Sequence, residues 1–218
     1  MPGGSPPPPT PAGWVRVDCH LHTVASGDAV LTLDQLAERA EQVGLDVVCI
    51  TDHNVTSAAV AAAERDLGLR VIVGEEIRTP DGDMIGLFLT ERVPYVLPVA
   101  EVVARIRAQG GLVYAPHPFD PARSSLGRVL PALCAAGAVD IVEVFNAKTA
   151  TREPNDRAAA LATAYALPGG AGSDAHDPPG VGAAFLEMPD FDGPAAFLAA
   201  LADARITGDG GIHLTGLD

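Results

Sequence analysis

Two periods of hydrophobic and polar positions alternate along the chain. Short apolar runs rich in Val, Ile and Leu, typical of buried strands, occur seven times, and Ala- and Leu-rich helical stretches separate them. The predicted strands cover residues 14–19, 46–51, 70–75, 84–89, 111–116, 140–145 and 169–173. The predicted helices cover residues 32–43, 55–67, 98–109, 126–136, 155–166 and 193–204, the last lying behind the final strand. This alternation is typical of βα units around a parallel sheet.

The alternation is interrupted once, because turn residues 79–83 (TPDGD) join the third and fourth predicted strands without a helix. Several predicted helices end at a glycine in the position of a left-handed C-cap, namely Gly44, Gly68, Gly110 and Gly137. The pattern therefore predicts an α/β fold, a distorted (β/α)7 barrel.

The length of 218 residues fits one domain. Residues 1–13 are rich in Pro and Gly and are expected to form a disordered tail, whereas residues 14–218 are expected to form a single catalytic domain. The tail has no basic segment followed by an apolar one, as a signal peptide or membrane anchor would. The three cysteines are widely spaced in apolar runs, which indicates reduced thiols. A cytoplasmic protein is expected.

The formal net charge of −14 argues against binding to nucleic acid or to an anionic membrane, since such proteins usually carry a basic patch. A small anionic substrate stays compatible, because bound metal ions would offset part of the negative charge locally. No pattern along the chain indicates an oligomeric state.

Five of the six histidines follow the end of a predicted strand by one to three residues: His20, His22, His53, His117 and His176. The C-terminal ends of parallel strands face one side of a barrel, where barrel enzymes build their sites. We therefore expect these five imidazoles to converge there. His213, near the C-terminus, is expected on the surface.

Each cluster also has an ordinary interpretation. His20 and His22 are two residues apart on a strand and point to the same side, as a chelate needs, yet two exposed polar residues would show the same spacing. Asp52 or Asn54 could simply cap a helix. Glu75 and Glu76 could be solvated, and His117 could be incidental in a turn before Pro118. Asp174 and His176 repeat the spacing of the first pair.

Taken together, these groups form a His, Asp and Glu set without cysteine, which suits zinc, manganese or iron. The potential ligands exceed the needs of one ion, so two or three divalent metal ions are predicted. Such ions lower the pKa of bound water to about 7 and stabilise an anionic transition state.

The ordered motifs DxHxHT, TDH, GxE, HP and SDAH, here spanning Asp18 to His176, resemble the PHP (polymerase and histidinol phosphatase) superfamily. The resemblance implies a first ion bound by His20, His22, Glu76 and Asp174, and a second bound by Asp28, His53 and His176. It also implies that Glu76, rather than Glu75, bridges to a third ion near His117. Asp52 would orient His53 or His22 through the other ring nitrogen. Many relatives carry a further histidine between GxE and HP, and the segment DGDMIGLFL has none.

The resemblance implies a metal-dependent phosphoesterase that hydrolyses a small phosphorylated substrate, a monoester or a diester, through a metal-activated hydroxide. His176, Asp174 and His53 are the candidate catalytic residues for protonating the leaving group. Arg123, Lys148 and Asn146, on loops at the strand ends, are candidates for binding substrate or, for the two cations, solvated loop charges.

Two other enzyme classes fit the same residues. An amidohydrolase-type barrel also begins with His-x-His and ends with an aspartate. A single-strand nuclease of the PHP type is disfavoured by the acidic charge. A degenerate barrel that only binds metal or a partner is disfavoured because nearly every ligand position is occupied.

Overall fold

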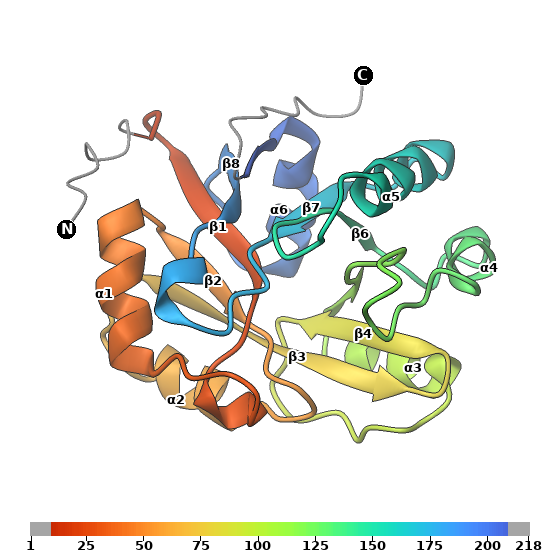
Figure 1. Ribbon diagram of the computed structural model, residues 1–218, viewed down its shortest axis with the longest axis horizontal. Helices are drawn as coiled ribbons and strands as arrows, with labels where there is room; N and C mark the ends of the chain where they lie inside the picture. Colours follow the sequence, from red (N-terminus) through yellow and green to blue (C-terminus); the bar gives the residue numbers. More distant parts are fainter. Residues whose placement is uncertain (1–9, 209–218) are drawn as a thin grey trace.

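The computed structural model describes residues 10–208, and these form a twisted sheet curled into a nearly closed barrel with helices around it (Figure 1). Within this part of the chain, nine strands pair in the order β7-β6-β5-β4-β3-β2-β1-β8-β9. The first seven are β1 (Trp14–Leu21), β2 (Val47–Ile50), β3 (Arg70–Thr79), β4 (Gly82–Leu87), β5 (Leu112–Ala115), β6 (Ile141–Asn146) and β7 (Gly169–Gly172). All seven predicted strands are confirmed, with ends shifted by up to four residues.

The expected interruption lies between β3 and β4. These two strands form an antiparallel hairpin in which Thr79 pairs with Gly82, and β4 is also antiparallel to β5. The other neighbouring pairs among β1 to β7 are parallel. Reversal of β4 therefore distorts an otherwise parallel α/β barrel.

Backbone hydrogen bonds close the barrel where the residues after β7 meet the C-terminal end of β1. The backbone N–H of Asp174 donates to the carbonyl of His20 over 2.7 Å, and that of His22 donates to the carbonyl of Ala175 over 2.9 Å. Gly172 permits this approach, because a Cβ at that position would collide with the Cβ of His20. The closure brings the first and last sequence motifs into direct contact.

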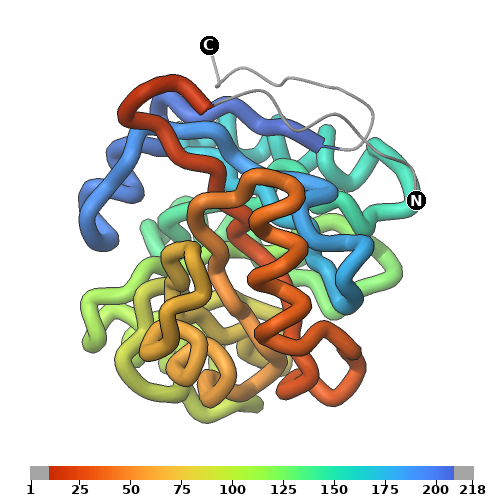
Figure 2. The backbone as a smooth tube through the Cα atoms, turned by 90° about the vertical axis from the view of Figure 1, so that its left-hand side faces the viewer, coloured from red at the N-terminus to blue at the C-terminus, as the bar shows by residue number. Residues whose placement is uncertain are grey.

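Two strands were not predicted from the sequence. β8 (Ala184–Pro189) pairs antiparallel with β1, and β9 (Arg205–Gly208) pairs antiparallel with β8. The red start of the chain consequently lies beside its blue end (Figure 2). In β8 the buried residues alternate with half-buried ones such as Phe185, so the strand lacks the continuous apolar run of the barrel strands. β9 has only four residues, too few for a clear period.

The six predicted helices are present among the described residues: α1 (Leu33–Val43), α2 (Ser57–Ala63), α3 (Val99–Ala108), α4 (Leu130–Ala135), α5 (Glu153–Ala164) and α6 (Gly193–Ala200). α6 lies between β8 and β9, not behind the last strand as expected. α4 is shorter than predicted because Pro131 stands at its first turn. Gly44, Gly68, Gly110 and Gly137 all have positive φ angles, as expected for left-handed residues near helix ends.

The expected tail falls only partly within the described chain. Residues 1–9 and 209–218, the latter including His213, lie outside it. Residues 11–14 form a turn in which the N–H of Trp14 donates to the carbonyl of Pro11. From residue 10 to residue 208, every helix is too short or too polar to cross a membrane.

Candidate metal centre

The carboxylate of Glu76, on β3, lies at the centre of a cluster of imidazoles inside the barrel. Its Oε2 lies 3.0 Å from Nδ1 of His53, 3.3 Å from Nε2 of His22 and 3.5 Å from Nε2 of His20. Its Oε1 lies 2.9 Å from Nε2 of His117. The histidines come from the end of β1 and from the loops that follow β2 and β5. One carboxylate thus contacts four histidines that are distant in sequence.

Asp174 and His176, after β7, complete the other side of the cluster. Asp174 Oδ1 lies 3.4 Å from Nε2 of His22 and 3.5 Å from Nδ1 of His176. Asp28 Oδ2, on the loop after β1, lies 3.3 Å from Nε2 of His53 and 3.6 Å from Nε2 of His176. The eight residues predicted as metal ligands therefore meet at one end of the barrel.

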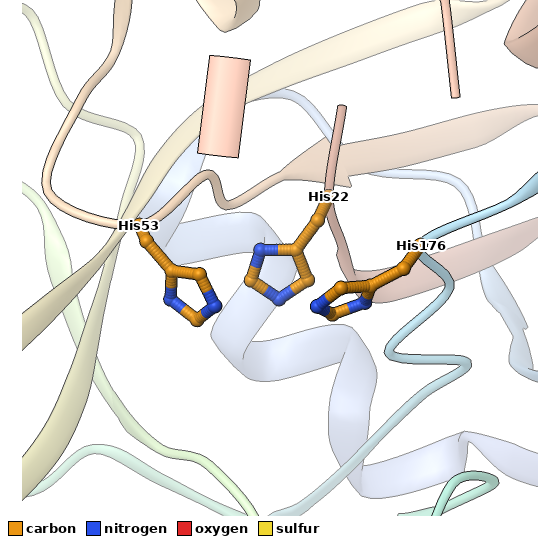
Figure 3. A group of neighbouring side chains, drawn as sticks. All are labelled: His22, His53 and His176. Atoms are coloured by element: carbon orange, nitrogen blue, oxygen red, sulfur yellow. The ribbon is translucent and has the colours of Figure 1, made fainter. Parts of the chain in front are cut away.

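Three subsets place one ligand atom of each member within 4.8 Å of the others. These are His20 with Glu76 and His117, His20 with His22 and Asp174, and His22 with His53 and His176. The last three side chains point toward one another from three separate segments (Figure 3). His-rich groups with one carboxylate suit zinc and similar transition metals.

The set of ligand atoms fits a metal cation because one buried carboxylate oxygen in it accepts no hydrogen bond. Asp174 Oδ1 is buried without a hydrogen-bond partner, although it faces the Nε2 atoms of His22 and His20. A buried carboxylate oxygen left unpaired costs free energy. A metal ion bound between these atoms would satisfy the oxygen and the imidazole lone pairs together.

Burial and neighbouring charges shift the pKa values of the cluster in opposite directions. Burial favours neutral groups, but the neighbouring imidazoles outweigh it and hold the pKa values of Glu76 and Asp174 below their usual range. Burial likewise opposes ionisation of His20, His53 and His117, yet nearby carboxylates raise their pKa values. Burial lowers the pKa of His22 to about 4. Protons and a metal ion should therefore compete for the ring nitrogens of the cluster.

His22 is held by a serine that sequence reasoning missed. Ser26 Oγ donates to Asp52 Oδ1 over 2.7 Å, so it accepts from Nδ1–H of His22 over 3.1 Å. This leaves Nε2 of His22 free to face the cluster. Asp52 was expected to contact His22 or His53 directly, but it binds Thr23 and Ser26 instead, because the loop after β1 folds over it. Asp52 therefore acts on the ring through a hydroxyl group.

Glu143, on β6, is a second residue that the prediction missed. It is fully buried, and its Oε1 lies 3.0 Å from Nδ1 of His20. A charged residue inside the apolar run IVEVF was the available signal, since such residues are rarely buried without partners. Strand patterning alone treats it as part of β6.

The two adjacent glutamates point in different directions. Glu75 lies away from the cluster, where its Oε2 accepts from the N–H of Val93 over 2.7 Å and burial raises its pKa to about 7. Asp83, in the segment DGDMIGLFL that lacks a histidine, is also buried. Burial and the nearby charge of Glu76 raise the pKa of its carboxyl group. The structure thus places Glu76, and not Glu75, among the histidines.

The three candidate substrate-binding residues all approach Asp174. Arg123 Nη2 lies 2.8 Å from Asp174 Oδ2, and Asn146 Nδ2 donates to the same oxygen over 3.3 Å. Lys148 Nζ lies 3.9 Å from Asp174 Oδ1 and 2.9 Å from Nδ1 of His176. Arg123 and Lys148 are 23% and 39% exposed, so both cations can reach a ligand at the mouth of the barrel, the end at which the histidines lie.

A distorted parallel barrel with buried histidines and carboxylates at its C-terminal end is the architecture of a metal-binding barrel protein. Comparison with known proteins makes this more specific. Residues 18–117 match the PHP domain and residues 152–206 match the PHP-associated family. The chain belongs to the PHP family.

Similar proteins cover most of the chain. The uncharacterized protein MJ0417 of Methanocaldococcus jannaschii is 36% identical over 197 residues, which is 86% of this chain and 79% of that protein. A solved Bacteroides vulgatus structure, a two-domain protein containing a predicted PHP-like metal-dependent phosphoesterase, is 19% identical. The match has a TM-score of 0.71 and covers 92% of this chain and 67% of the Bacteroides vulgatus chain, which shows that the two share a fold.

A shorter match concerns a nuclease. The 5'-3' exoribonuclease Rnm of Salmonella typhimurium is 42% identical over 69 residues, corresponding to 30% of this chain and 23% of that protein.

Proposed function

We propose that this protein is a metal-dependent hydrolase that cleaves the phosphate ester bond of a small anionic substrate. The observation that carries the proposal is the combination at Asp174. One of its oxygens faces two imidazole nitrogens without a hydrogen-bond donor, and the other contacts Arg123. A candidate cation site and a candidate anion-binding group thus meet at one side chain, which supports the hydrolysis of a phosphoester.

Two or three divalent ions would be held by groups that already face one another. His20, His22, Glu76 and Asp174 would bind one ion, and Asp28, His53 and His176 a second. Glu76 would bridge to a third beside His117. When bound, such ions lower the pKa of a coordinated water to about 7 and neutralise phosphoryl charge. Zinc, manganese and iron all suit these donors.

The protein side chains would bind and orient the substrate. Arg123 offers a planar guanidinium for two phosphoryl oxygens, and Lys148 adds a second positive charge at the same mouth. Asn146 would hydrogen-bond substrate or hold Asp174 in place. The leaving group would depart toward solvent on the side of His53 and His176, which are 26% and 16% exposed, and be protonated there.

The test begins with the unmodified protein purified without chelators. Elemental emission should find two or three equivalents of zinc, manganese or iron. The protein should then hydrolyse members of a phosphomonoester and phosphodiester panel and leave amides and lactams intact. Hydrolysis of amides or lactams alone would favour the amidohydrolase-type alternative and reject the proposal.

Two variants and one control connect the activity to the site. His20→Ala and Asp174→Ala should lose bound metal and phosphate-ester hydrolysis together. Arg65→Ala, which removes an exposed ion pair with Asp34 on the helical side of the barrel, should keep both. Phosphate-ester turnover that survives in both site variants would overturn the proposal.

A nuclease activity is the second candidate, and the similarity to the exoribonuclease favours it. The net charge of −14 opposes it, since nucleic-acid binding usually relies on a basic surface. Single-stranded RNA and DNA tested at several salt concentrations separate the two. Salt-sensitive binding with cleavage would identify a nucleic acid as the substrate. Hydrolysis of small esters alone would identify a small molecule as the substrate.

A further inference from the structure

Glu143 makes four hydrogen-bond contacts from one fully buried position on β6. Its Oε1 accepts from the hydroxyl of Tyr114 over 3.0 Å and lies 3.0 Å from Nδ1 of His20. Its Oε2 accepts from the backbone N–H of His117 over 2.6 Å and from Nδ2 of Asn146 over 3.0 Å. Two of these partners are candidate metal ligands and a third approaches Asp174.

We propose that Glu143 is a positioning residue that fixes the tautomer of His20 and thereby directs its Nε2 lone pair toward the metal ions. An ionised carboxylate only accepts hydrogen bonds, so the proton of the neutral imidazole must be on Nδ1. Nε2, which lies 3.1 Å from Nε2 of His22 and 3.5 Å from Glu76 Oε2, then has no proton. This inference rests on the proposed metal centre and assigns Glu143 no contact with substrate.

The partners of Glu143 determine how a glutamine of the same shape would be oriented at this position. On the Oε2 side, the N–H of His117 can only donate, and the amide of Asn146 is fixed because its Oδ1 accepts from the N–H of Lys148. In Glu143→Gln, the side-chain oxygen must therefore face these two donors. The NH₂ group must then face His20 and Tyr114, where only a change of tautomer and a rotation of the hydroxyl avoid a clash of donors. The proton of His20 would move to Nε2, where it blocks the metal.

The effect should appear in metal binding and in the histidine nitrogens, without any substrate. Competition with a chelator measures the zinc affinity of the unmodified protein, Glu143→Gln and Tyr114→Phe. We expect Glu143→Gln to lose about 10- to 100-fold in affinity, as is typical when the group orienting a metal-bound histidine is removed. Tyr114→Phe removes a partner of the same carboxylate oxygen but keeps the carboxylate, so its loss should be smaller.

The ¹⁵N spectrum of zinc-loaded, histidine-labelled protein tests the tautomer directly, with the His20 signals assigned by their loss in His20→Gln. The unmodified protein and Tyr114→Phe should show His20 protonated at Nδ1 and unprotonated at Nε2. Glu143→Gln should show the reverse. A merely structural role would lower stability without exchanging the two nitrogens.

Several results would overturn the inference. One is an unmodified protein in which His20 Nε2 carries the proton, which decides the question even if Glu143→Gln does not fold. Another is a folded Glu143→Gln protein with unchanged zinc affinity and tautomer. Glu143→Asp, which keeps an acceptor-only carboxylate, should retain the Nδ1 proton, and a reversed tautomer there would also contradict it. Because zinc binding is measured alone, absence of phosphate-ester turnover would reject the proposed function and leave this test intact.

Discussion

The cluster has an inner half and an outer half, and the two differ in what surrounds them. The inner residues His20, Glu76 and His117 are at most 4% exposed, and Glu143 fixes two of them. In the outer half, His53 is 26% exposed and Asp28 is 55% exposed. Buried, doubly anchored ligands are already ordered before metal binds, whereas exposed ones must still lose conformational freedom. We therefore expect a tightly held inner ion and a more exchangeable outer one next to substrate.

Two residues of the cluster also have unusual backbone angles. His117 and Asp174 adopt positive φ angles of 28° and 51°, which are uncommon for residues other than glycine. Hydrogen bonds hold both: the N–H of His117 donates to Glu143, and the N–H of Asp174 donates to the carbonyl of His20. Strained residues of this kind concentrate at functional sites, where the surrounding structure maintains them. The hydrogen bonds of their backbone N–H groups thus hold these two residues in place.

The largest effect should come from replacing one carboxylate in each half by its amide. Glu76→Gln removes the acceptor shared by four imidazoles, so we expect loss of the first and third ions and of hydrolysis. Asp28→Asn should lose only the outer ion. Elemental emission after gel filtration measures the stoichiometry. Equal metal content in the two variants would show that the halves do not differ.

The stability of the metal-free protein should depend on pH in a direction set by the histidines and carboxylates of the cluster. His20, His53 and His117 have raised pKa values, so their contribution is complete below about pH 6.5 and is lost as pH rises through the folded pKa values. Asp174 has a lowered pKa, so its contribution exists above about pH 4 and is lost as pH falls further. His22, with a pKa of about 4, acts against the other histidines.

Thermal unfolding between pH 6 and pH 9 checks this expectation. The Tm of chelator-treated protein should fall as pH rises across this range. In the zinc-loaded protein the fall should be smaller or reversed, because metal replaces the protons as the balancing charge. Parallel curves with and without zinc would mean that the histidine protons do not stabilise the metal-free cluster.

A moderate effect is expected at the mouth, where the outer half meets solvent. Arg123→Met and Lys148→Met should each raise KM for a phosphate ester about 10-fold, the loss of one charged hydrogen bond. Metal content should stay unchanged. Arg128→Met is the matched control, because Arg128 is 88% exposed on the same loop region and lies 3.8 Å from Asp81. A KM that rises equally in the control would indicate a general charge effect.

The smallest effect is expected for Ser26→Ala, which removes the hydroxyl between Asp52 and His22. Ser26 is only partly buried, so water can replace the hydroxyl as an acceptor for the ring. Zinc affinity should fall less than in Glu143→Gln, measured by the same chelator competition. A loss as large as that of Glu143→Gln would show that the two supports are equivalent.

The sequence by itself determined the strands, the helices and the end of the barrel at which the histidines gather. Apolar runs followed closely by His or Asp identify both a strand and the side chains at its C-terminal end, because the apolar pattern and the chain direction are local features of the sequence. The same reasoning missed β8 and β9, in which burial alternates or the strand is too short to show a period.

Only the tertiary structure decided how the clusters are supported. Barrel closure at Gly172 brings Asp174 to His20, over 150 residues away in sequence, and no spacing rule predicts that approach. The tertiary structure also points Glu76 toward the histidines and Glu75 away from them. It places Glu143 next to Nδ1 of His20 and Ser26 next to Nδ1 of His22. The residues that could bind metal were predictable from the sequence. The residues that orient them were not, because hydrogen bonds between distant strands depend on how the whole sheet curls.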